Sequence, residues 1–347
     1  MTDRTRELEE WLAMLQRRES LRNDLRSLSD LGCSYCARGK SGALSPDFSL
    51  HRTTMRLEIL KYCPRSPTRL AAGTQVRQAP RSTSAPHDST GSRLAEPGSG
   101  LAAIYEPLLH SDPLVIAQLG QTLDGRIATH TGHSHYVTGP ETIVHLHRLR
   151  ALVDAVVVGA GTAIADNPRL TVRRVPGQNP VRVVLDPSAR VPLERELFRD
   201  AAAPTIWVVG MRARMATVPS GVEVLRLAEF SEGGYPTHQT PGDPTRMRSP
   251  DGWPTASGGF RPADVLQLLA AQGLNRVLVE GGGITVSRFL DAGVLNRLHL
   301  TIAPLLLGSG RASLSLNPID HLDQALRPRW RRFLLGADLL YDLELDR

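Results

Sequence analysis

Hydrophobic residues follow two different periodicities along the chain, and a long polar stretch separates them. Residues 5–28 place apolar side chains three and four positions apart, which predicts an amphipathic helix docked on another surface. Over residues 30–100 this periodicity is lost and Ser, Pro, Arg, Thr and Gly dominate, as is typical of a linker or disordered arm. We therefore expect a helical extension over 1–29, a low-complexity linker over 30–103 and a folded domain over 104–347.

The predicted domain alternates short apolar runs with segments of helical periodicity. The runs that predict buried strands are 113–120, 154–161, 181–186, 204–210, 276–282 and 297–304. The helical patterns are 140–152, 192–200, 262–273 and 284–292. This alternation is typical of an α/β fold whose mainly parallel sheet is covered by helices on both faces. Two further apolar runs within 333–345 have no helix between them and predict an antiparallel edge, whereas the Gly/Pro-rich residues 231–260 predict a long surface loop.

Composition narrows the class of protein. The 347 residues are 41% hydrophobic and 22% charged with a net charge of +6, which is typical of a soluble globular protein and does not indicate a nucleic-acid-binding face. The sequence has neither the run of roughly 18 apolar residues that a membrane span needs nor a secretory signal, so we expect a cytoplasmic protein. Its three cysteines, even with His51, are too loosely spaced to favour a metal site, and no metal is expected.

Two glycine-rich turns, 159–161 and 281–283, directly follow predicted strands. Each supplies two glycines of a dinucleotide fingerprint, but Ile164 and Val286 hold the place of the third glycine. Taken singly, each turn is compatible with a plain strand-to-helix connection. Together, at the carboxyl ends of strands in one sheet, they favour a nucleotide binder of a non-Rossmann type, because helix N-termini there offer amide groups to phosphate.

Polar groups also gather after the first and second predicted strands. Asp124 and Gly125 follow the first, where a plain hairpin turn is the simpler interpretation. Arg150 and Arg173 flank the second and suit a phosphate-bearing substrate, since guanidinium binds phosphate in a bidentate manner. Arg150 alone would equally offset a helix dipole.

The order of these motifs resembles the reductase domain of riboflavin biosynthesis. That domain is the C-terminal half of bifunctional diaminohydroxyphosphoribosylaminopyrimidine deaminase/aminouracil-phosphoribosyl reductase proteins. The matching segments are Thr122 to Ala128, Gly132 to Ser134, Leu149 to Ala151, Asp154 to Val156, Gly159 to Arg173, Pro180 to Asp186, Glu280 to Gly283 and Ala303 to Gly308. The resemblance implies a dihydrofolate-reductase-like three-layer α/β/α fold with a mainly parallel mixed sheet and a C-terminal antiparallel edge. It also implies NADPH as the cofactor and a homodimer as the assembly.

The resemblance carries roles onto individual residues. The positions that match cofactor contacts are Gly120, Tyr136, Thr162, Asp166, Gly282, Gly283, Ile284, Thr285, Val286 and Ser287. The positions that match contacts to a phosphoribosyl pyrimidine are Ser134, Arg150, Leu170, Arg173 and Glu280. The implied reaction is hydride transfer from NADPH to C1′ of the ribosyl group, which becomes a ribityl chain. Asp124 and Glu280 are the candidate proton donors.

Three departures from the family pattern leave alternatives open. Tyr136 replaces the common tryptophan, Pro187 replaces a common serine, and nothing resembles the zinc signature of the deaminase half, so a stand-alone reductase is expected. The alternatives are a reductase of pterin or dihydrofolate, and a non-catalytic NADP(H)-binding protein whose N-terminal helix recruits a partner.

Overall fold

The fold is described from a computed structural model that covers residues 3–36, 100–135, 137–215, 217–218, 220–230 and 259–345, with the backbone alone for 3–4 and 25–36. The expectations for Tyr136 and for most of 30–103 and 231–260 lie outside these residues and stay predictions. Two compact units divide the chain, Met1–Leu21 with Gly91–Arg347, and Arg22–Thr90.

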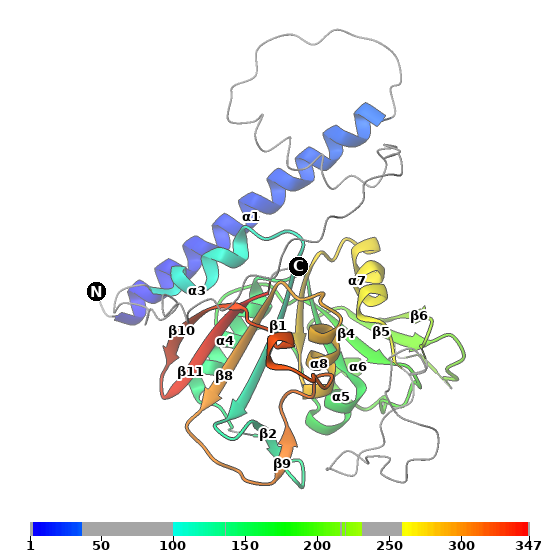
Figure 1. Cartoon of the computed structure of the whole chain (residues 1–347). Helices are drawn as coiled ribbons and strands as arrows, with labels where there is room; N and C mark the ends of the chain where they lie inside the picture. The colour runs from blue at the N-terminus through cyan, green and yellow to red at the C-terminus, as the bar shows by residue number, and fades with distance from the viewer. Residues whose placement is uncertain are drawn as a thin grey trace, which may run out of the picture. The chain divides into compact units, whose positions relative to one another are not determined.

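The first unit is built on one large mixed sheet. Its nine described strands lie in the order β10, β11, β8, β1, β7, β3, β4, β5, β6 (Figure 1). The strands are β1 (Leu114–Thr122), β3 (Ala155–Gly159), β4 (Val181–Asp186), β5 (Thr205–Gly210), β6 (Val222–Leu227), β7 (Arg276–Glu280), β8 (Arg297–Ala303), β10 (Arg329–Leu335) and β11 (Asp338–Glu344). Strands β8 to β6 pair in parallel, and β10 and β11 are antiparallel. The expected mainly parallel sheet with an antiparallel C-terminal edge is therefore confirmed.

Helices cover both faces of the sheet, so the expected three layers are present. The helices are α1 (Asp3–Cys36), α3 (Gly100–Leu109), α4 (Pro140–Ala151), α5 (Ala160–Asp166), α6 (Glu196–Arg199), α7 (Pro262–Ala271), α8 (Gly283–Asp291) and the short 3₁₀ helix η1 (Leu322–Gln324). One apolar core joins α3, α4, α5 and α6 to the sheet, and the other joins α7 and α8 to the opposite face. Along β1, Leu114 and Ile116 enter the first core while Val115 and Ala117 enter the second, which explains why the strand sequence is continuously apolar.

Several elements differ from the sequence-based expectation. Strand β6 was not predicted, because its sequence VEVLRL places the charged Glu223 and Arg226 three residues apart and so breaks the alternation that indicates a strand. Helix α6 has only four residues of the predicted 192–200. A small two-stranded sheet, β2 (Arg126–Thr129) with β9 (Gly310–Ala312), was also not predicted. Among the described helices, none is both long and apolar enough to cross a lipid bilayer.

The N-terminal helix docks through a narrower stripe than its leucines suggested. Trp11 and Met14 are each 1% exposed and belong to the core beneath α3, whereas Leu8 and Leu12 are 45% and 40% exposed. The ring of Trp11 packs edge-on against Tyr105 of α3 with centroids 5.6 Å apart. The docking surface of α1 is therefore aromatic and lies on one side of the helix.

Candidate active site

A cavity of about 300 Å³ opens at the carboxyl ends of β1, β3 and β7. Open α/β sheets bind ligands at this edge, because strands end there and helices begin. Among the described residues that line the cavity are Gln118, Gly120, Ser134, His135, Thr138, Thr162, Asp166, Leu170, Glu280 and Gly281. Six of the residues predicted for the site, Gly120, Ser134, Thr162, Asp166, Leu170 and Glu280, thus share one cavity.

A row of polar side chains crosses the sheet at the floor of this cavity. Gln118 of β1 stands in register with Glu280 of β7 on one side and with His299 of β8 on the other. Asp342 of β11 continues the row beside His299. Neighbours in register point to the same face of a sheet, so all four side chains face the layer that contains α4. This row is buried, with exposures of 8% or less.

Glu280 forms a bidentate ion pair with Arg150 of α4. Nε and Nη2 of Arg150 donate to the two carboxylate oxygens of Glu280, each over 2.7 Å. Nη1 of Arg150 donates to the backbone oxygen of Thr171 over 3.1 Å. Because both side chains are nearly fully buried, the pair is a rigid part of the cavity wall, and every terminus of the Arg150 guanidinium already has a partner. Arg150 therefore holds Glu280 in place.

A second basic group, the arginine cluster, lies beside this pair and consists of Arg169, Arg173 and Arg174 with His147. The backbone amide of Arg173 donates to Nδ1 of His147 over 2.9 Å, and its Nη1 donates to Oγ1 of Thr171 over 2.6 Å. Burial, and then the nearby positive charges, lower the pKa of Arg173. The same two causes lower the pKa of His147 to about 4. Arg169 is paired with Glu196 over 3.2 Å, whereas the described residues give the guanidinium of Arg173 no ion pair, which leaves Arg173 as the group best placed for an anion.

The chain reaches the arginine cluster through a strained bend at Leu170. This residue has φ of +55° and is 1% exposed, and it lines the cavity. A left-handed conformation costs a non-glycine residue roughly 1 kcal/mol. Here it turns the backbone so that Leu170 closes the cavity wall while Thr171 and Arg173 meet α4.

The two glycine turns lie side by side and contact each other. The amide of Gly282 donates to Oγ1 of Thr162 over 2.8 Å, and a β-carbon at Gly281 (φ +87°) would lie 2.7 Å from the Thr162 methyl group. A β-carbon at Gly159 would lie 2.5 Å from Oγ1 of Thr285. Close packing of one turn on the other is therefore a sufficient reason for glycine at 159 and 281.

The paired turns also have the features that a dinucleotide phosphate group needs. A β-carbon at Gly161 would meet nothing within 4 Å, so that turn is open. On the second turn, Ile284 is 60% exposed at the start of the nine-residue helix α8, whose first amide groups have no carbonyl within the helix. Val286 is fully buried, and the buried Ser287 hydroxyl accepts from the amide of Ser315. Gly283 is buried, and a β-carbon there would overlap the backbone oxygen of Ser313, so the exposed part of the predicted stretch is Ile284.

Of the remaining predicted residues, Ser134 and Asp166 contact each other, and Gly120 allows the cavity wall to approach β1. Oγ of Ser134 donates to Oδ1 of Asp166 over 3.3 Å, which joins the segment before α4 to the end of α5. A β-carbon at Gly120 would lie 2.7 Å from Cγ2 of Thr138, so glycine is needed for this part of the wall to approach β1.

Asp124, in contrast, is not among the residues that line the cavity. Its carboxylate accepts hydrogen bonds from Oγ1 of Thr122 and from the amides of Leu307 and Gly308. The Thr122 hydrogen bond is the main reason why the pKa of Asp124 lies below its usual value. Through these contacts, Asp124 joins the turn after β1 to the segment after β8.

Sequence reasoning missed one polar group of the cavity floor, Gln118. It is 8% exposed, lines the cavity, and has no hydrogen-bond partner among the described residues. Its two neighbours in the row, Glu280 and His299, are engaged with Arg150 and His145. The available signal was a single amide side chain within the otherwise apolar strand LVIAQLG.

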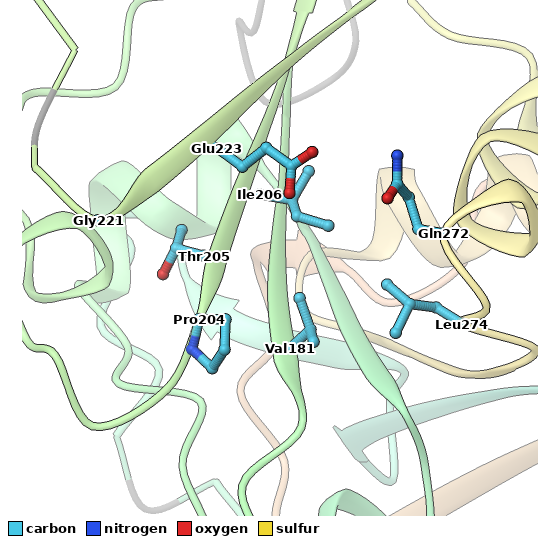
Figure 2. Close-up of a pocket in the computed structure, with 8 residues that line it drawn as sticks. All are labelled: Val181, Pro204, Thr205, Ile206, Gly221, Glu223, Gln272 and Leu274. Carbon is cyan, nitrogen blue, oxygen red and sulfur yellow. The ribbon is translucent and has the colours of Figure 1, made fainter.

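A second hollow, of about 270 Å³, lies at the opposite edge of the sheet (Figure 2). Val181 and Thr205 are the first residues of β4 and β5, and Gln272 and Leu274 follow α7 on the facing side. Of the eight residues that line this hollow, Glu223 alone carries a charge. It shares no residue with the cavity at the carboxyl edge, where the charged groups converge.

Comparison with known proteins agrees with this geometry. The model of the RibD C-terminal domain matches residues 113–331. The chain is 34% identical over 240 residues to a 2,5-diamino-6-ribosylamino-4(3H)-pyrimidinone 5′-phosphate reductase of Methanothermobacter thermautotrophicus, covering 66% of this chain and 97% of that one. It is 32% identical over 232 residues to the riboflavin biosynthesis protein RibD of Aquifex aeolicus, covering 66% of this chain and 56% of that protein.

A solved structure shares the fold. RibD of Acinetobacter baumannii superposes with a TM-score of 0.53 at 24% identity, over 71% of this chain and 63% of that one. The chain thus spans about half to two thirds of the RibD proteins that it matches and nearly all of the archaeal reductase. Helices α1 and α3 lie outside the matched residues 113–331.

Proposed function

This chain belongs to the RibD C-terminal domain family, and we propose that it is an NADPH-dependent reductase of riboflavin biosynthesis. The substrate is a 5-amino-6-(5-phosphoribosylamino)uracil-type compound or its 2,5-diaminopyrimidinone counterpart, and the product is the ribityl form. The archaeal reductase with 34% identity supports the substrate class by its name. The observation that carries the proposal is the cavity at the carboxyl ends of β1, β3 and β7, where Gly281 of the second glycine turn lies beside Glu280, and Glu280 is held by Arg150.

The residues of the cavity divide into a cofactor side and a substrate side. NADPH, when bound, supplies the hydride that reduces C1′ of the ribosyl group. Gly161, Thr162, Gly283 and Ile284 would hold its diphosphate through backbone amides and the Thr162 hydroxyl, while the amide of Gly282 is already bonded to Thr162. Gly120, Asp166 and Tyr136 are assigned to the nicotinamide end. Thr285, Val286 and Ser287 support the turn from behind.

On the substrate side, positioning and charge neutralisation are the work of the protein. The arginine cluster neutralises the 5′-phosphate, and Arg173 is the guanidinium with donors to spare. Glu280, held by Arg150, accepts hydrogen bonds from sugar hydroxyls or from the pyrimidine. Ser134 and Leu170 close the space around the ring. Holding C1′ and the nicotinamide in contact accounts for most of the rate enhancement that such a site provides.

Neither candidate proton donor is arranged to act as a hydrogen-bond donor. Asp124 accepts three hydrogen bonds, and Glu280 accepts two from a guanidinium. A carboxyl group in either place acts as an acceptor. We therefore assign Glu280 to orienting the substrate and Asp124 to holding the turn after β1.

Steady-state NADPH oxidation by the full chain tests the proposal. The substrates are the aminouracil ribosyl phosphate, its 2,5-diamino counterpart and dihydrofolate, each also with NADH. We expect turnover of one of the two ribosyl phosphates with NADPH, and a ribityl product identified by mass spectrometry. Turnover of dihydrofolate instead would identify a pterin reductase. NADPH binding without turnover of any substrate would identify a non-catalytic binding protein.

The proposal includes a cytoplasmic homodimer, as the family resemblance implies. Strand β10 is the outermost described strand on its side of the sheet, and its Leu334 is 74% exposed. An exposed apolar side chain on a sheet edge favours association. Light scattering at micromolar concentration should give twice the chain mass of 37.9 kDa; a single chain mass would contradict this part of the proposal.

A further inference from the structure

The first turns of α1 lie directly behind the arginine cluster. Two segments carry that cluster and its neighbour Arg150: the C-terminal turn of α4, and the segment 170–180 that follows the bend at Leu170. The amide of Arg173 donates to His147 and joins the two segments on the side of the cavity. On the other side, α1 contacts both of them.

The first contact is made by Trp11 with the segment 170–180. Its indole Nε1 donates to the backbone oxygen of Pro176 over 2.9 Å, and the ring is 1% exposed. The next residue, Gly177, has φ of +151°, and a β-carbon there would lie 2.5 Å from Cβ of Ala151. Trp11 thus holds the segment at the point where it packs on the last residue of α4.

The second contact is made by Glu7 with Arg148 of α4. Nη2 of Arg148 donates to Oε1 of Glu7 over 2.7 Å, while its guanidinium carbon lies 5.7 Å from the ring centroid of Trp11 and 5.9 Å from that of Tyr105. Arg148 is next in sequence to His147 and two residues before Arg150. An arginine stacked on two aromatic rings and paired with a carboxylate fixes the rotation of this helical turn.

A third contact fixes the end of the same turn. Nη2 of Arg18 donates to the backbone oxygen of Val153 over 3.2 Å and to Oδ1 of Asp154 over 3.3 Å. These residues connect α4 to β3. Glu7, Trp11 and Arg18 are spaced four and seven residues apart and so lie on one side of α1, which lets one helix contact both segments that form the phosphate end of the site.

We propose that α1 is a positioning element for the phosphate end of the site, with Trp11 and Glu7 as its positioning residues. The nature of the ligand rests on the proposed function. Because α1 lies outside residues 113–331, this brace is an addition to the reductase domain. Its loss allows α4 and the segment 170–180 to move apart, which separates Arg173 from the phosphate but leaves the cofactor turns unchanged.

Two conservative variants of the full chain test this role. Trp11→Phe keeps the ring and removes the hydrogen bond to Pro176, and Glu7→Gln removes the charge opposite Arg148. Leu8→Ala, at an exposed position of the same helix, is the matched control. Ribose 5-phosphate binding is measured by calorimetry, NADPH binding by fluorescence titration, and the KM and kcat of the ribosyl phosphate by steady-state assay.

We expect Trp11→Phe to raise the Kd of ribose 5-phosphate and the KM of the substrate about fivefold, the effect of one lost hydrogen bond. Glu7→Gln should raise both by about threefold. Leu8→Ala should change neither, and NADPH affinity and kcat should stay within about twofold in all three. Unchanged sugar-phosphate affinity in a folded Trp11→Phe protein would overturn the proposal.

An equal weakening of NADPH and sugar phosphate would also overturn it, because a merely structural role of α1 predicts a loss at both ends of the site. The proposed function is judged separately, by turnover of the unaltered protein. If that protein binds ribose 5-phosphate and NADPH but reduces neither ribosyl phosphate, the proposed reaction is wrong, and the effect of Trp11→Phe on sugar-phosphate binding still decides the role of α1.

Discussion

At the scale of single residues, the two arginines assigned to phosphate from the sequence have different surroundings. Arg150 has all of its guanidinium nitrogens engaged with Glu280 and Thr171. Arg173 makes one side-chain hydrogen bond, to Thr171. Their functional difference follows from these partners, since the charge of Arg150 is already matched by Glu280, whereas the described residues give Arg173 no ion pair and leave its charge for an incoming phosphate.

The first prediction separates these two arginines. Arg173→Ala should raise the KM of the ribosyl phosphate at least tenfold, through loss of about 1.5–3 kcal/mol of charge-assisted hydrogen bonding. NADPH affinity should stay unchanged, as should the free energy of unfolding within about 1 kcal/mol. Arg150→Ala should instead destabilise the fold by about 3–5 kcal/mol, because it leaves the buried Glu280 carboxylate unpaired. Steady-state kinetics, cofactor titration and urea unfolding measure the three quantities. A loss of NADPH affinity in Arg173→Ala would reverse the two binding assignments.

The second prediction concerns Gln118, whose amide faces the cavity without a partner among the described residues. Gln118→Leu should preserve the fold and NADPH binding but lower kcat/KM for the ribosyl phosphate about tenfold, the effect of one hydrogen bond that a leucine cannot make. Gln118→Glu places a second carboxylate in register with Glu280 and should lower it further. If Gln118→Leu has unaltered kinetics, this amide does not contact the substrate.

At the scale of elements, α4 is positioned by residues far away in the sequence. Its N-cap, Gly139, has no side chain, and the cap is supplied by Asp338 from the start of β11. Oδ2 of Asp338 accepts from the amide of Gly139 over 2.7 Å and from Oγ1 of Thr142 over 2.6 Å. The C-terminal hairpin therefore holds the end of α4 that adjoins the cavity wall at Thr138.

The third prediction tests this cap. Asp338→Ala should lower the free energy of unfolding by about 2–3 kcal/mol, since it removes a helix cap and leaves a buried hydroxyl without an acceptor. Asp338→Asn keeps one acceptor oxygen and should cost about 1 kcal/mol. Urea unfolding followed by circular dichroism measures both. Equal stabilities of the two variants would show that the charge, and not the hydrogen bonds, is what matters.

The predicted and observed elements show which parts of the fold local sequence patterns determine. The parallel strands other than β6, together with α7, were predictable, because local apolar periodicity defines them. The motifs placed Glu280 and Arg150 in one site but did not predict their ion pair. That contact depends on how α4 packs against β7, which local sequence does not determine. Gln118 was missed for a related reason. A single amide within an apolar run gives no local signal of function, because its role depends on the residues beside it on the neighbouring strands.

At the scale of the whole molecule, a chain of buried titratable groups joins four elements. The hydroxyl of Tyr105 on α3 lies 2.7 Å from Nδ1 of His145 on α4, and Nε2 of His145 lies 3.0 Å from Nδ1 of His299 on β8. Nε2 of His299 lies 3.3 Å from Oδ1 of Asp342 on β11. Burial, and then the charges of His299 and Arg148, lower the pKa of His145 well below its usual value.

The acid dependence of stability follows from the directions of these shifts. Burial alone would raise the pKa of Asp342, but the contact with His299 and the charges of Arg297 and Arg331 bring it well below its usual range. An unfolded histidine takes up a proton near pH 6.5, whereas His145 and His147 in the folded protein do so only at lower pH. Between these values the unfolded chain binds more protons, so the free energy of unfolding falls as pH falls. The carboxylate of Asp342 adds a further loss below about pH 4.

The fourth prediction is therefore a stability that is constant above about pH 7 and falls from pH 6.5 towards pH 4, measured as urea midpoints across the series. His147→Asn is the matched variant, because the Asn amide oxygen can replace Nδ1 as acceptor for the Arg173 amide but does not titrate. Because the folded pKa of His147 is about 4, the unaltered protein loses free energy of unfolding as pH falls from 6.5 to 4.5, and this variant keeps that part. The difference between the two at pH 4.5 should be about 1–2 kcal/mol, after allowance for solvent screening. The remaining loss in His147→Asn reports on His145. A midpoint that is independent of pH between 6.5 and 4.5 would mean that neither imidazole is held neutral by the fold.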